Sequence, residues 1–263
     1  MISLIPMAGR GHRFVEEGYQ VPKPFIPILG KPMFAAALES FPKARKTIFV
    51  CLQEHASNSV FRNSIHALCA DASVVVADEI TQGQACTCLL AEPHLPLDES
   101  LLISSIDYQI VFDQKAFALL AEDPSVDVLI FTFQLKFMTY SKPEQYAYCL
   151  TDESGRVLKV VEKKLISNTP ELDPAVVGTF YYRRASDFIK ASKKMIEAGK
   201  RVNNEYYVGT SMNELIAEGK NVRVFPVDKF ICFGTPLDVR LLEAWAGFFS
   251  AEPSHPFQKH KGD

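Results

Sequence analysis

Short apolar runs alternate with segments of helical periodicity along the first half of the chain. The apolar runs predict buried strands over residues 2–6, 47–52, 73–76, 101–104 and 126–133. The segments between them predict helices over residues 32–40, 56–70, 84–92 and 114–121, the last with Asp113 as its N-cap. This order is typical of an α/β fold, with a Rossmann-like, mostly parallel central sheet and helices on both of its faces.

The second half of the chain follows a different pattern. Two polar-apolar stretches over residues 145–151 and 156–161 flank Asp152 to Gly155, a sequence typical of a hairpin turn. Further elements are predicted as a strand over 176–182, helices over 186–198 and 211–218, and a strand over 222–227. The sequence from Thr235 to Asp238 has a hydroxyl cap, a proline and an acid, which predicts a helix start. The helix would run to about residue 249.

We therefore expect a single domain over residues 1–250. Its first part, about 1–135, would carry the parallel strands, and a smaller mixed part would follow over about 136–250. Residues 251–263 are polar and are expected to form a tail. The sequence contains no repeat and no low-complexity linker that would divide the chain.

Composition and charge narrow the class of protein. The 263 residues carry a net charge of −3, which gives no electrostatic reason to expect nucleic acid or an acidic membrane as partner. No apolar run approaches the roughly 20 residues that a bilayer span needs. No cleavable leader is evident, and the six cysteines lie in apolar contexts typical of reduced thiols. We expect a cytoplasmic protein, with its oligomeric state left open.

The motif after the first predicted strand indicates phosphate binding. Gly9 and Gly11 are separated by one residue, and Arg13 and Lys23 follow, the lysine between two prolines. Glycines let backbone N–H groups approach an anion closely. The two cations would neutralise the part of the anion's charge that the backbone alone does not. The dinucleotide fingerprint would need a third glycine at Phe14, and the Walker motif is absent.

These motifs, followed in order by Gly30-Lys31-Pro32-Met33, resemble the sugar-phosphate nucleotidylyltransferase family. Its members join a nucleoside triphosphate to a phosphorylated sugar or similar small phosphate and release pyrophosphate. The resemblance covers about residues 1–245 and implies a nucleotide-binding first half and a sugar-phosphate-binding second half. It also implies that Ala8, Gly9, Gly11 and Arg13 hold the triphosphate. Lys23 would stabilise charge on the α-phosphate.

Two further positions are implied on the nucleotide side. Gln82 and Gly83 open the third predicted helix, where the resemblance implies contacts to the nucleobase. Asp107 follows an apolar strand, and the carboxyl ends of parallel strands are where open α/β sheets bind ligands. The resemblance implies that Asp107 holds Mg²⁺ and is catalytic together with Arg13 and Lys23. Ile106 stands where the family commonly has glycine.

On the acceptor side, the resemblance implies contacts from Glu162, Lys163, Gly178 and Glu205. A glutamate accepts hydrogen bonds from hydroxyls and a lysine pairs with phosphate, so Glu162 and Lys163 suit a sugar phosphate. Gly178 would let substrate approach the backbone. Glu205 lies in the sequence Asn204-Glu205-Tyr206-Tyr207, which resembles a substrate-side loop of the family.

The chain departs from the family at Cys232, where relatives often have a second metal-binding aspartate. A thiol is a poor ligand for a hard cation such as Mg²⁺. Two alternatives remain from the sequence. Either Asp107, substrate phosphates and water hold the metal, or another acid substitutes, Asp228 being the nearest in sequence.

The expected function is Mg²⁺-dependent transfer of a nucleotidyl group from an NTP to a sugar 1-phosphate. One alternative is a CTP-dependent enzyme acting on a non-sugar phosphate such as phosphocholine. Another, motivated by Ile106 and Cys232, is a non-catalytic nucleotide-sugar-binding module. A glycosyltransferase of related fold is less consistent with Arg13 and Lys23, because a sugar donor has no triphosphate to hold. Paired Cys and His residues elsewhere lack the spacing of a zinc site.

Overall fold

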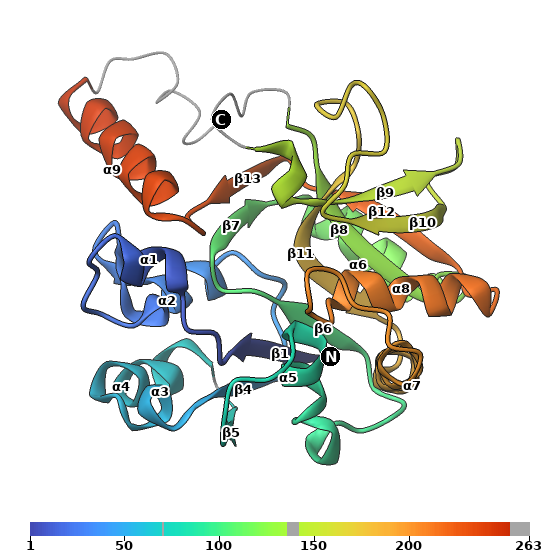
Figure 1. The fold of residues 1–263 in the computed structure, drawn as a ribbon, viewed down its shortest axis with the longest axis horizontal. Coiled ribbons are helices and arrows are strands. Elements are labelled where there is room, and N and C mark those ends of the chain that lie inside the picture. Colours follow the sequence, from blue (N-terminus) through green and yellow to red (C-terminus); the bar gives the residue numbers. More distant parts are fainter. Residues whose placement is uncertain (70, 136–141, 253–263) are drawn as a thin grey trace.

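A computed structural model describes residues 1–69, 71–135 and 142–252 of the chain (Figure 1). The helices are α1 (His12–Glu16), α2 (Met33–Leu38), α3 (Gln53–Ser57), α4 (Ser59–Leu68), α5 (Gln84–Leu89), α6 (Gln114–Glu122), α7 (Ala185–Glu197), α8 (Val208–Ala217) and α9 (Pro236–Ala251). The longer strands are β1 (Ile2–Met7), β4 (Lys46–Leu52), β5 (Ala72–Ala77), β6 (Leu101–Ser104), β8 (Val128–Phe133), β9 (Ala147–Thr151), β10 (Val157–Glu162), β11 (Ala175–Tyr182) and β12 (Val222–Pro226).

The central sheet combines a parallel part with an antiparallel part. Strands β5, β4, β1 and β6 lie side by side and parallel, in that order. Strand β11 pairs antiparallel with β6 and also with β8 and β9, and β10 extends the sheet beyond β9. Strand β12 pairs parallel with β8. Strand β1 thus lies in the interior of the sheet, between β6 and β4. The loop that follows it therefore leaves the sheet near the middle of the row of strand ends.

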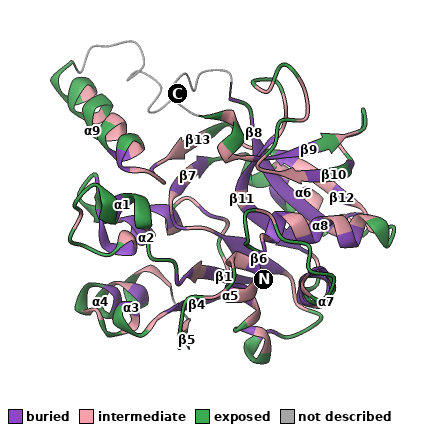
Figure 2. Cartoon of the chain, in the orientation of Figure 1, coloured by how far each residue is buried: buried purple, intermediate pink, exposed green. Residues whose placement is uncertain are grey.

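Helices cover both faces of the sheet, as the alternation of apolar residues requires (Figure 2). On one face Ile5 packs in a cluster with Phe34 of α2 and Phe61 of α4. On the other face Leu4 belongs to a cluster with Phe188 of α7. Neighbouring residues of β1 therefore anchor opposite helix layers, because successive side chains of a strand point to opposite faces. The predicted α/β, Rossmann-like fold class is confirmed.

A two-stranded ribbon stands outside the central sheet. Strand β7 (Tyr108–Val111) pairs antiparallel with β13 (Lys229–Cys232), so Cys232 lies opposite Tyr108. A second small ribbon joins β2 (Pro27–Ile28) and β3 (Lys31–Pro32). The sequence pattern did not predict these short strands or α1. The ribbon of β7 and β13 matters for the site, because it carries the region of Cys232 to the end of β6.

Several local predictions can be compared directly with the structure. Asp113 caps α6 and accepts hydrogen bonds from Lys115 N–H and Ala116 N–H. The start of α9 has the expected capping box, in which Thr235 and Asp238 bond reciprocally. The single helix predicted over 56–70 is wrong, because Asn58 is extended and caps α4, separating it from α3. Pro32 precedes α2 instead of occupying its first position.

Within the described ranges, no helix is long and apolar enough to cross a membrane. The predicted polar tail begins inside the last turn of α9, and its residues 253–263 lie outside the described residues.

Candidate active site

A cavity of about 930 Å³ opens at the carboxyl ends of β1 and β6. Its wall is formed by the loop after β1, the loop after β6, the ends of β10 and β11, and the start of α9. Elements from both halves of the chain therefore contribute to one space. This is the edge of an open α/β sheet at which ligands are ordinarily bound.

The loop after β1 forms a cationic corner of the cavity. Gly9, Gly11, Arg13 and Lys23 all line it. Gly11 precedes α1 with a φ of 65°, a left-handed conformation that glycine adopts without strain. A Cβ atom added at Gly11 would lie 2.7 Å from Cβ of Lys23. The absence of a side chain at Gly11 thus lets the Lys23 stem pack against the loop and project its ammonium group into the cavity.

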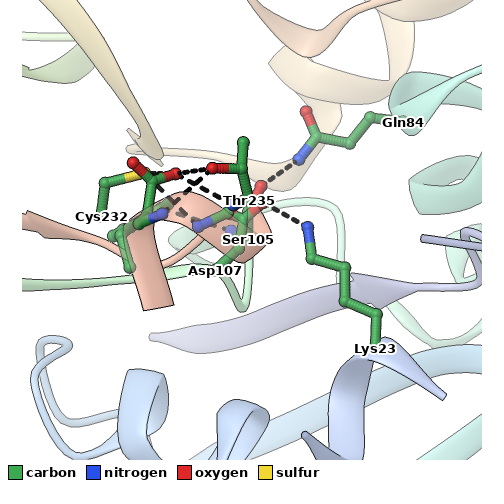
Figure 3. Close-up of polar contacts among 9 residues, drawn as sticks. Lys23, Gln84, Ser105, Asp107, Cys232 and Thr235 are labelled. Carbon is green, nitrogen blue, oxygen red and sulfur yellow. Dashed lines mark hydrogen bonds and ion pairs between the residues drawn. The ribbon is translucent and has the colours of Figure 1, made fainter. Parts of the chain in front are cut away.

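Lys23 and Asp107 form an ion pair across this corner (Figure 3). Lys23 Nζ donates a hydrogen bond to Asp107 Oδ2 at 2.6 Å, and the side chains are 21% and 30% exposed. Burial by itself would raise the pKa of Asp107, but the charge and hydrogen bond of Lys23, with a smaller effect of Arg13, hold this pKa below its ordinary value. Asp107 therefore carries its negative charge at neutral pH.

The β7–β13 ribbon and the start of α9 place Gly234 and two side chains, those of Cys232 and Asp238, near Asp107. A Cβ atom at Gly234 would lie 3.2 Å from Asp107 Oδ2 and 3.5 Å from Cys232 Sγ, so these two groups flank the same glycine. Cys232 Sγ donates to Asp238 Oδ2 at 3.5 Å, and Asp238 also lines the cavity. Burial, then the charges of Asp238 and Asp107, raise the pKa of the Cys232 thiol. The thiol is therefore protonated and acts as a donor.

The suggestion that Asp228 replaces the missing aspartate is wrong. Asp228 lies at the opposite end of β13, where its N–H donates to the Val111 carbonyl, and it lines a separate cavity of about 620 Å³. The acid that does lie beside Cys232 is Asp238, which follows Asp228 by ten positions in the sequence. From the sequence, Asp238 is predicted only as the acid at the start of α9, and its place in the capping box is what brings it to the site.

The donor set around Asp107 fits a hard cation in part. Within the part of the chain that the structure describes, no group of three or more His, Cys, Asp or Glu side chains is arranged to hold a metal ion. Mg²⁺ often uses one or two carboxylates and completes its shell with substrate phosphates and water. The Asp107 carboxylate fits that pattern, and the protonated Cys232 thiol does not add a ligand.

The loop at the start of α5, predicted to contact the nucleobase, also lines the cavity. Thr81, Gly83 and Gln84 line the space, and Gln84 Nε2 donates to Ser105 Oγ at 2.8 Å. Gln82, predicted to contact the nucleobase, is not among the cavity-lining residues in the described ranges. Its side chain instead accepts a hydrogen bond from Arg201 Nη2 at 2.6 Å. The structure thus brings Gly83 to the cavity and turns Gln82 away from it.

The residues predicted to contact the acceptor line a second part of the cavity, where Glu205 lies near Glu162 and Lys163 lies near Tyr207. Glu162, Lys163, Gly178 and Glu205 all line the cavity, together with Tyr207. Burial, and the charge of Glu205, raise the pKa of Glu162 to about 7, although Lys163 opposes the shift. Lys163 Nζ donates to the Gln145 carbonyl and lies 5.5 Å from the Tyr207 ring centroid. Two acids, one lysine and an aromatic ring therefore face this end.

Several residues that line the cavity were not predicted from the sequence. Arg10 and His12 come from the loop after β1, and Tyr207 lies in the sequence Asn204-Glu205-Tyr206-Tyr207, of which only Glu205 was predicted as a contact. Tyr146 and Phe230 contribute aromatic rings, each in contact with the other. For the last two no local signal existed, because Tyr146, just before β9, and Phe230 of β13 come from distant segments that meet only in the folded chain.

Comparison with known proteins places the chain in a family. A family model for nucleotidyl transferases matches residues 2–239, and the chain belongs to this family of enzymes. The bifunctional protein GlmU of Acholeplasma laidlawii is 28% identical over 223 residues, which are 81% of this chain and 44% of the relative. The chain thus spans less than half the length of that relative.

Solved structures share the same fold. The nucleoside-diphosphate-sugar pyrophosphorylase of Vibrio cholerae RC9 matches with a TM-score of 0.75 and 21% identity, over 92% of this chain and 99% of that chain. The inositol-1-phosphate CTP transferase of T. maritima matches with a TM-score of 0.71 and 16% identity, over 94% of this chain and 96% of that chain. At these identities the likeness concerns the fold.

Proposed function

We propose that the protein transfers a nucleotidyl group from an NTP to a sugar 1-phosphate and releases pyrophosphate. The observation that carries the proposal is the Lys23–Asp107 pair, placed between a cationic phosphate loop and a polar acceptor end within one cavity. The relatives support the same reaction class, since a nucleoside-diphosphate-sugar pyrophosphorylase has this fold. Residues 1–135 would supply most of the nucleotide subsite, and residues 136–250 most of the acceptor subsite.

In the proposed reaction, an oxygen of the acceptor phosphate attacks the α-phosphorus in line. The bond from the α-phosphorus to the bridging oxygen breaks, and its electron pair leaves with pyrophosphate. The nucleophile is already an anion at neutral pH, so no protein base is needed. Arg13 and Lys23 would neutralise charge that develops on the phosphoryl oxygens. Mg²⁺, held by Asp107 when bound, would supply further neutralisation of the phosphates.

The acceptor end favours a group that carries hydroxyls. Glu162, whose pKa is raised to about 7, accepts hydrogen bonds from hydroxyls when ionised and donates one when protonated, and Gly178 leaves backbone open in the cavity wall with a φ of 106°. Lys163 would pair with the acceptor phosphate once it leaves the Gln145 carbonyl. These features support a sugar phosphate.

A second candidate is a cytidylyl transfer to a cationic alcohol phosphate such as phosphocholine. The observation that favours it is the combination of Tyr146, Tyr207 and Phe230 with two carboxylates along the acceptor end. Aromatic faces and carboxylates are what binds quaternary ammonium groups. The fold of the T. maritima inositol-1-phosphate CTP transferase is compatible with this candidate.

The test is pyrophosphate release by the purified protein with Mg²⁺, each common NTP and a panel of acceptors. The panel contains sugar 1-phosphates, phosphocholine and its neutral isostere 3,3-dimethylbutyl phosphate. Release with a sugar 1-phosphate supports the first candidate. Release with phosphocholine, and much less with the isostere, supports the second. No release above the no-acceptor background with any pair would overturn both.

A further inference from the structure

One short segment, residues 201–207 between α7 and α8, contacts both ends of the cavity. Its centre is a tight hairpin in which Val202 and Glu205 exchange backbone hydrogen bonds of 3.0 and 2.9 Å. Asn203 and Asn204 between them have φ angles of 49° and 64°. Left-handed conformations at both central residues define the two-residue turn that best joins paired strands, and asparagine tolerates them well. The segment is therefore a defined structure.

The backbone of Tyr206 binds the nucleotide-side loop on two sides. Tyr206 N–H donates to the Gln82 carbonyl at 2.9 Å, and the Tyr206 carbonyl accepts from Ala85 N–H at 3.0 Å. A Cβ atom at Gly83 would lie only 2.5 Å from the Tyr206 nitrogen, so this approach requires glycine. The hydrogen bonds of Tyr206 thus reach residues on both sides of Gly83, the residue that lines the nucleotide subsite.

Arg201 spans the same two segments with its side chain. Its Nη2 donates to Gln82 Oε1 at 2.6 Å, and its Cζ lies 4.7 Å from the centroid of the Tyr206 ring. A guanidinium group can hydrogen-bond at its edge and stack with its face at once, which a lysine cannot do. Neither Arg201 nor Gln82 is among the described residues that line the cavity. Their contact therefore acts on the position of the loop.

The two neighbours of Tyr206 face the acceptor end. Glu205 and Tyr207 both line the cavity there. A hydrogen bond with Glu205 contributes, after burial, to a raised pKa of Tyr207. The same segment thus fixes the nucleotide-side loop through residue 206 and the acceptor wall through residues 205 and 207.

We propose that the 201–207 segment couples the nucleotide subsite to the acceptor subsite, with Arg201 as a positioning residue. The proposal rests on the proposed function, because it takes the two ends of the cavity as the two substrate subsites. A nucleotide that orders the loop around Gly83 orders Glu205 and Tyr207 at the same time. The acceptor then meets a wall that is already ordered, and by thermodynamic linkage the acceptor strengthens nucleotide binding by the same factor.

The experiment is hydrogen exchange of the full chain, read by mass spectrometry, with the Mg²⁺ complexes of UTP, CTP, dTTP, ATP and GTP in turn. For the nucleotide that binds, we expect exchange to slow at residues 9–14 and also at residues 202–207. The expected slowing over 202–207 is at least about fivefold, the lower end of ordinary coupling between sites. Glucose 1-phosphate added to that complex tests the reverse direction at residues 81–85.

Three variants identify the role of Arg201. In Arg201→Met, protection over 9–14 should persist while protection over 202–207 falls severalfold. Arg201→Lys, which keeps the charge and a donor, should restore part of it. Arg45→Met is the matched control, because Arg45 is also an exposed arginine, held by Glu99 and outside the cavity lining. It should behave like the unchanged protein.

Failure of the coupling, of the role of Arg201 and of the proposed function would each give a different result. Protection at 9–14 without any change at 202–207 would overturn the coupling and leave the proposed function intact. Equal protection at 202–207 in Arg201→Met and the unchanged protein would overturn the role of Arg201. If no nucleotide protects residues 9–14, the proposed function fails and the coupling falls with it.

Discussion

The ammonium nitrogen of Lys23 lies 2.6 Å from a carboxylate oxygen of Asp107, although the two residues are 84 positions apart. Lys23 follows the loop after β1, and Asp107 lies in the loop after β6, so the pair forms only when β1 and β6 lie side by side. Lys23 favours the charged form of Asp107, and their hydrogen bond orients both side chains. A triphosphate entering the cavity would compete with Asp107 for Lys23, and this competition gives the pair a measurable signature.

Replacing Lys23 by methionine should impair turnover far more than binding. The variant keeps most of the side-chain stem and removes the charge that the mechanism places on the phosphoryl group. We expect turnover to fall by about 10²–10³-fold, as for the loss of one preorganised donor. The nucleotide Kd, measured by calorimetry, should change less than about tenfold.

Lys31→Met is the matched control for Lys23→Met. Lys31 lies in the next sequence that carries the family resemblance, Gly30-Lys31-Pro32-Met33, but it is exposed, pairs with Glu39 at 2.6 Å and does not line the cavity. The turnover of Lys31→Met should match that of the unchanged protein. Equal losses in both variants would remove the role assigned to Lys23.

Asp107→Asn should have opposite effects on catalysis and on metal-free binding. The change removes a negative charge beside the phosphates and releases Lys23. In EDTA the nucleotide should therefore bind more tightly, by about tenfold for one unit charge near a protein surface. With Mg²⁺, turnover should fall at least about 100-fold because the proposed metal ligand is lost. Weaker nucleotide binding in EDTA would contradict this account of the pair.

Glu162 should make stability depend on pH in a defined direction. Burial raises its pKa from 4.5 to about 7, so between these values the folded protein holds a proton that the unfolded chain releases. The contribution of Glu162 to stability therefore declines as the pH rises through this window. Glu162→Gln removes the cost of burying the ionised carboxylate. It should therefore raise the free energy of unfolding at pH 8 by up to about 3 kcal/mol.

The check is urea denaturation of both proteins at pH 4.5 and pH 8. The difference in unfolding free energy between Glu162→Gln and the unchanged protein should be small at the lower pH and larger at the higher pH. A difference that stays constant, or that is larger at pH 4.5, would show that the Glu162 carboxyl is not held protonated by its surroundings.

Gly9→Ala should separate nucleotide binding from folding. A Cβ atom at Gly9 meets no atom within 4 Å, so the variant should fold with nearly unchanged stability. The added methyl group would lie where the backbone must approach the phosphates, and the nucleotide Kd should rise at least about tenfold. Gly11→Ala, at a φ of 65° and 2.7 Å from Lys23 Cβ, should instead lose stability by about 1–3 kcal/mol.

Gly247→Ala serves as the control for these glycine variants. Gly247 lies within α9, away from the cavity lining, and a Cβ atom there also meets nothing within 4 Å. Alanine should be neutral or stabilising by up to about 1 kcal/mol, because it favours the helix. If Gly9→Ala binds nucleotide as well as Gly247→Ala does, the loop after β1 is not the phosphate site.

The cationic corner after β1 was predictable because its signal is local. Gly9, Gly11, Arg13 and Lys23 lie within one short stretch, and the strand before them is a plain apolar run. Asp107 was predictable for a related reason, since a carboxylate at the end of a buried strand falls on the ligand-binding edge of the sheet. The helix caps at Asp113 and Thr235 also depend on neighbouring residues only.

The remaining features depend on pairings that no local pattern encodes. Strands β7 and β13 are four residues each and lie more than a hundred positions apart, yet their pairing brings Cys232 and Asp238 beside Asp107. Asp228 was chosen because it is nearer than Asp238 to Cys232 in the sequence. In the structure Asp238 is the nearer of the two, because Asp228 lies at the far end of β13. Gln82 was assigned to the nucleobase, but Arg201, far away in sequence, holds its side chain outside the cavity.

The central claim is that an acceptor phosphate oxygen attacks the α-phosphorus of an NTP in this cavity. Its most direct test uses the most active acceptor of the panel with all its phosphate oxygens labelled with ¹⁸O, and mass spectrometry of both products. The account predicts labelled oxygen bridging the two phosphorus atoms of the nucleotide product and unlabelled pyrophosphate. Label in the pyrophosphate, or product formed without the labelled bridge, would contradict it.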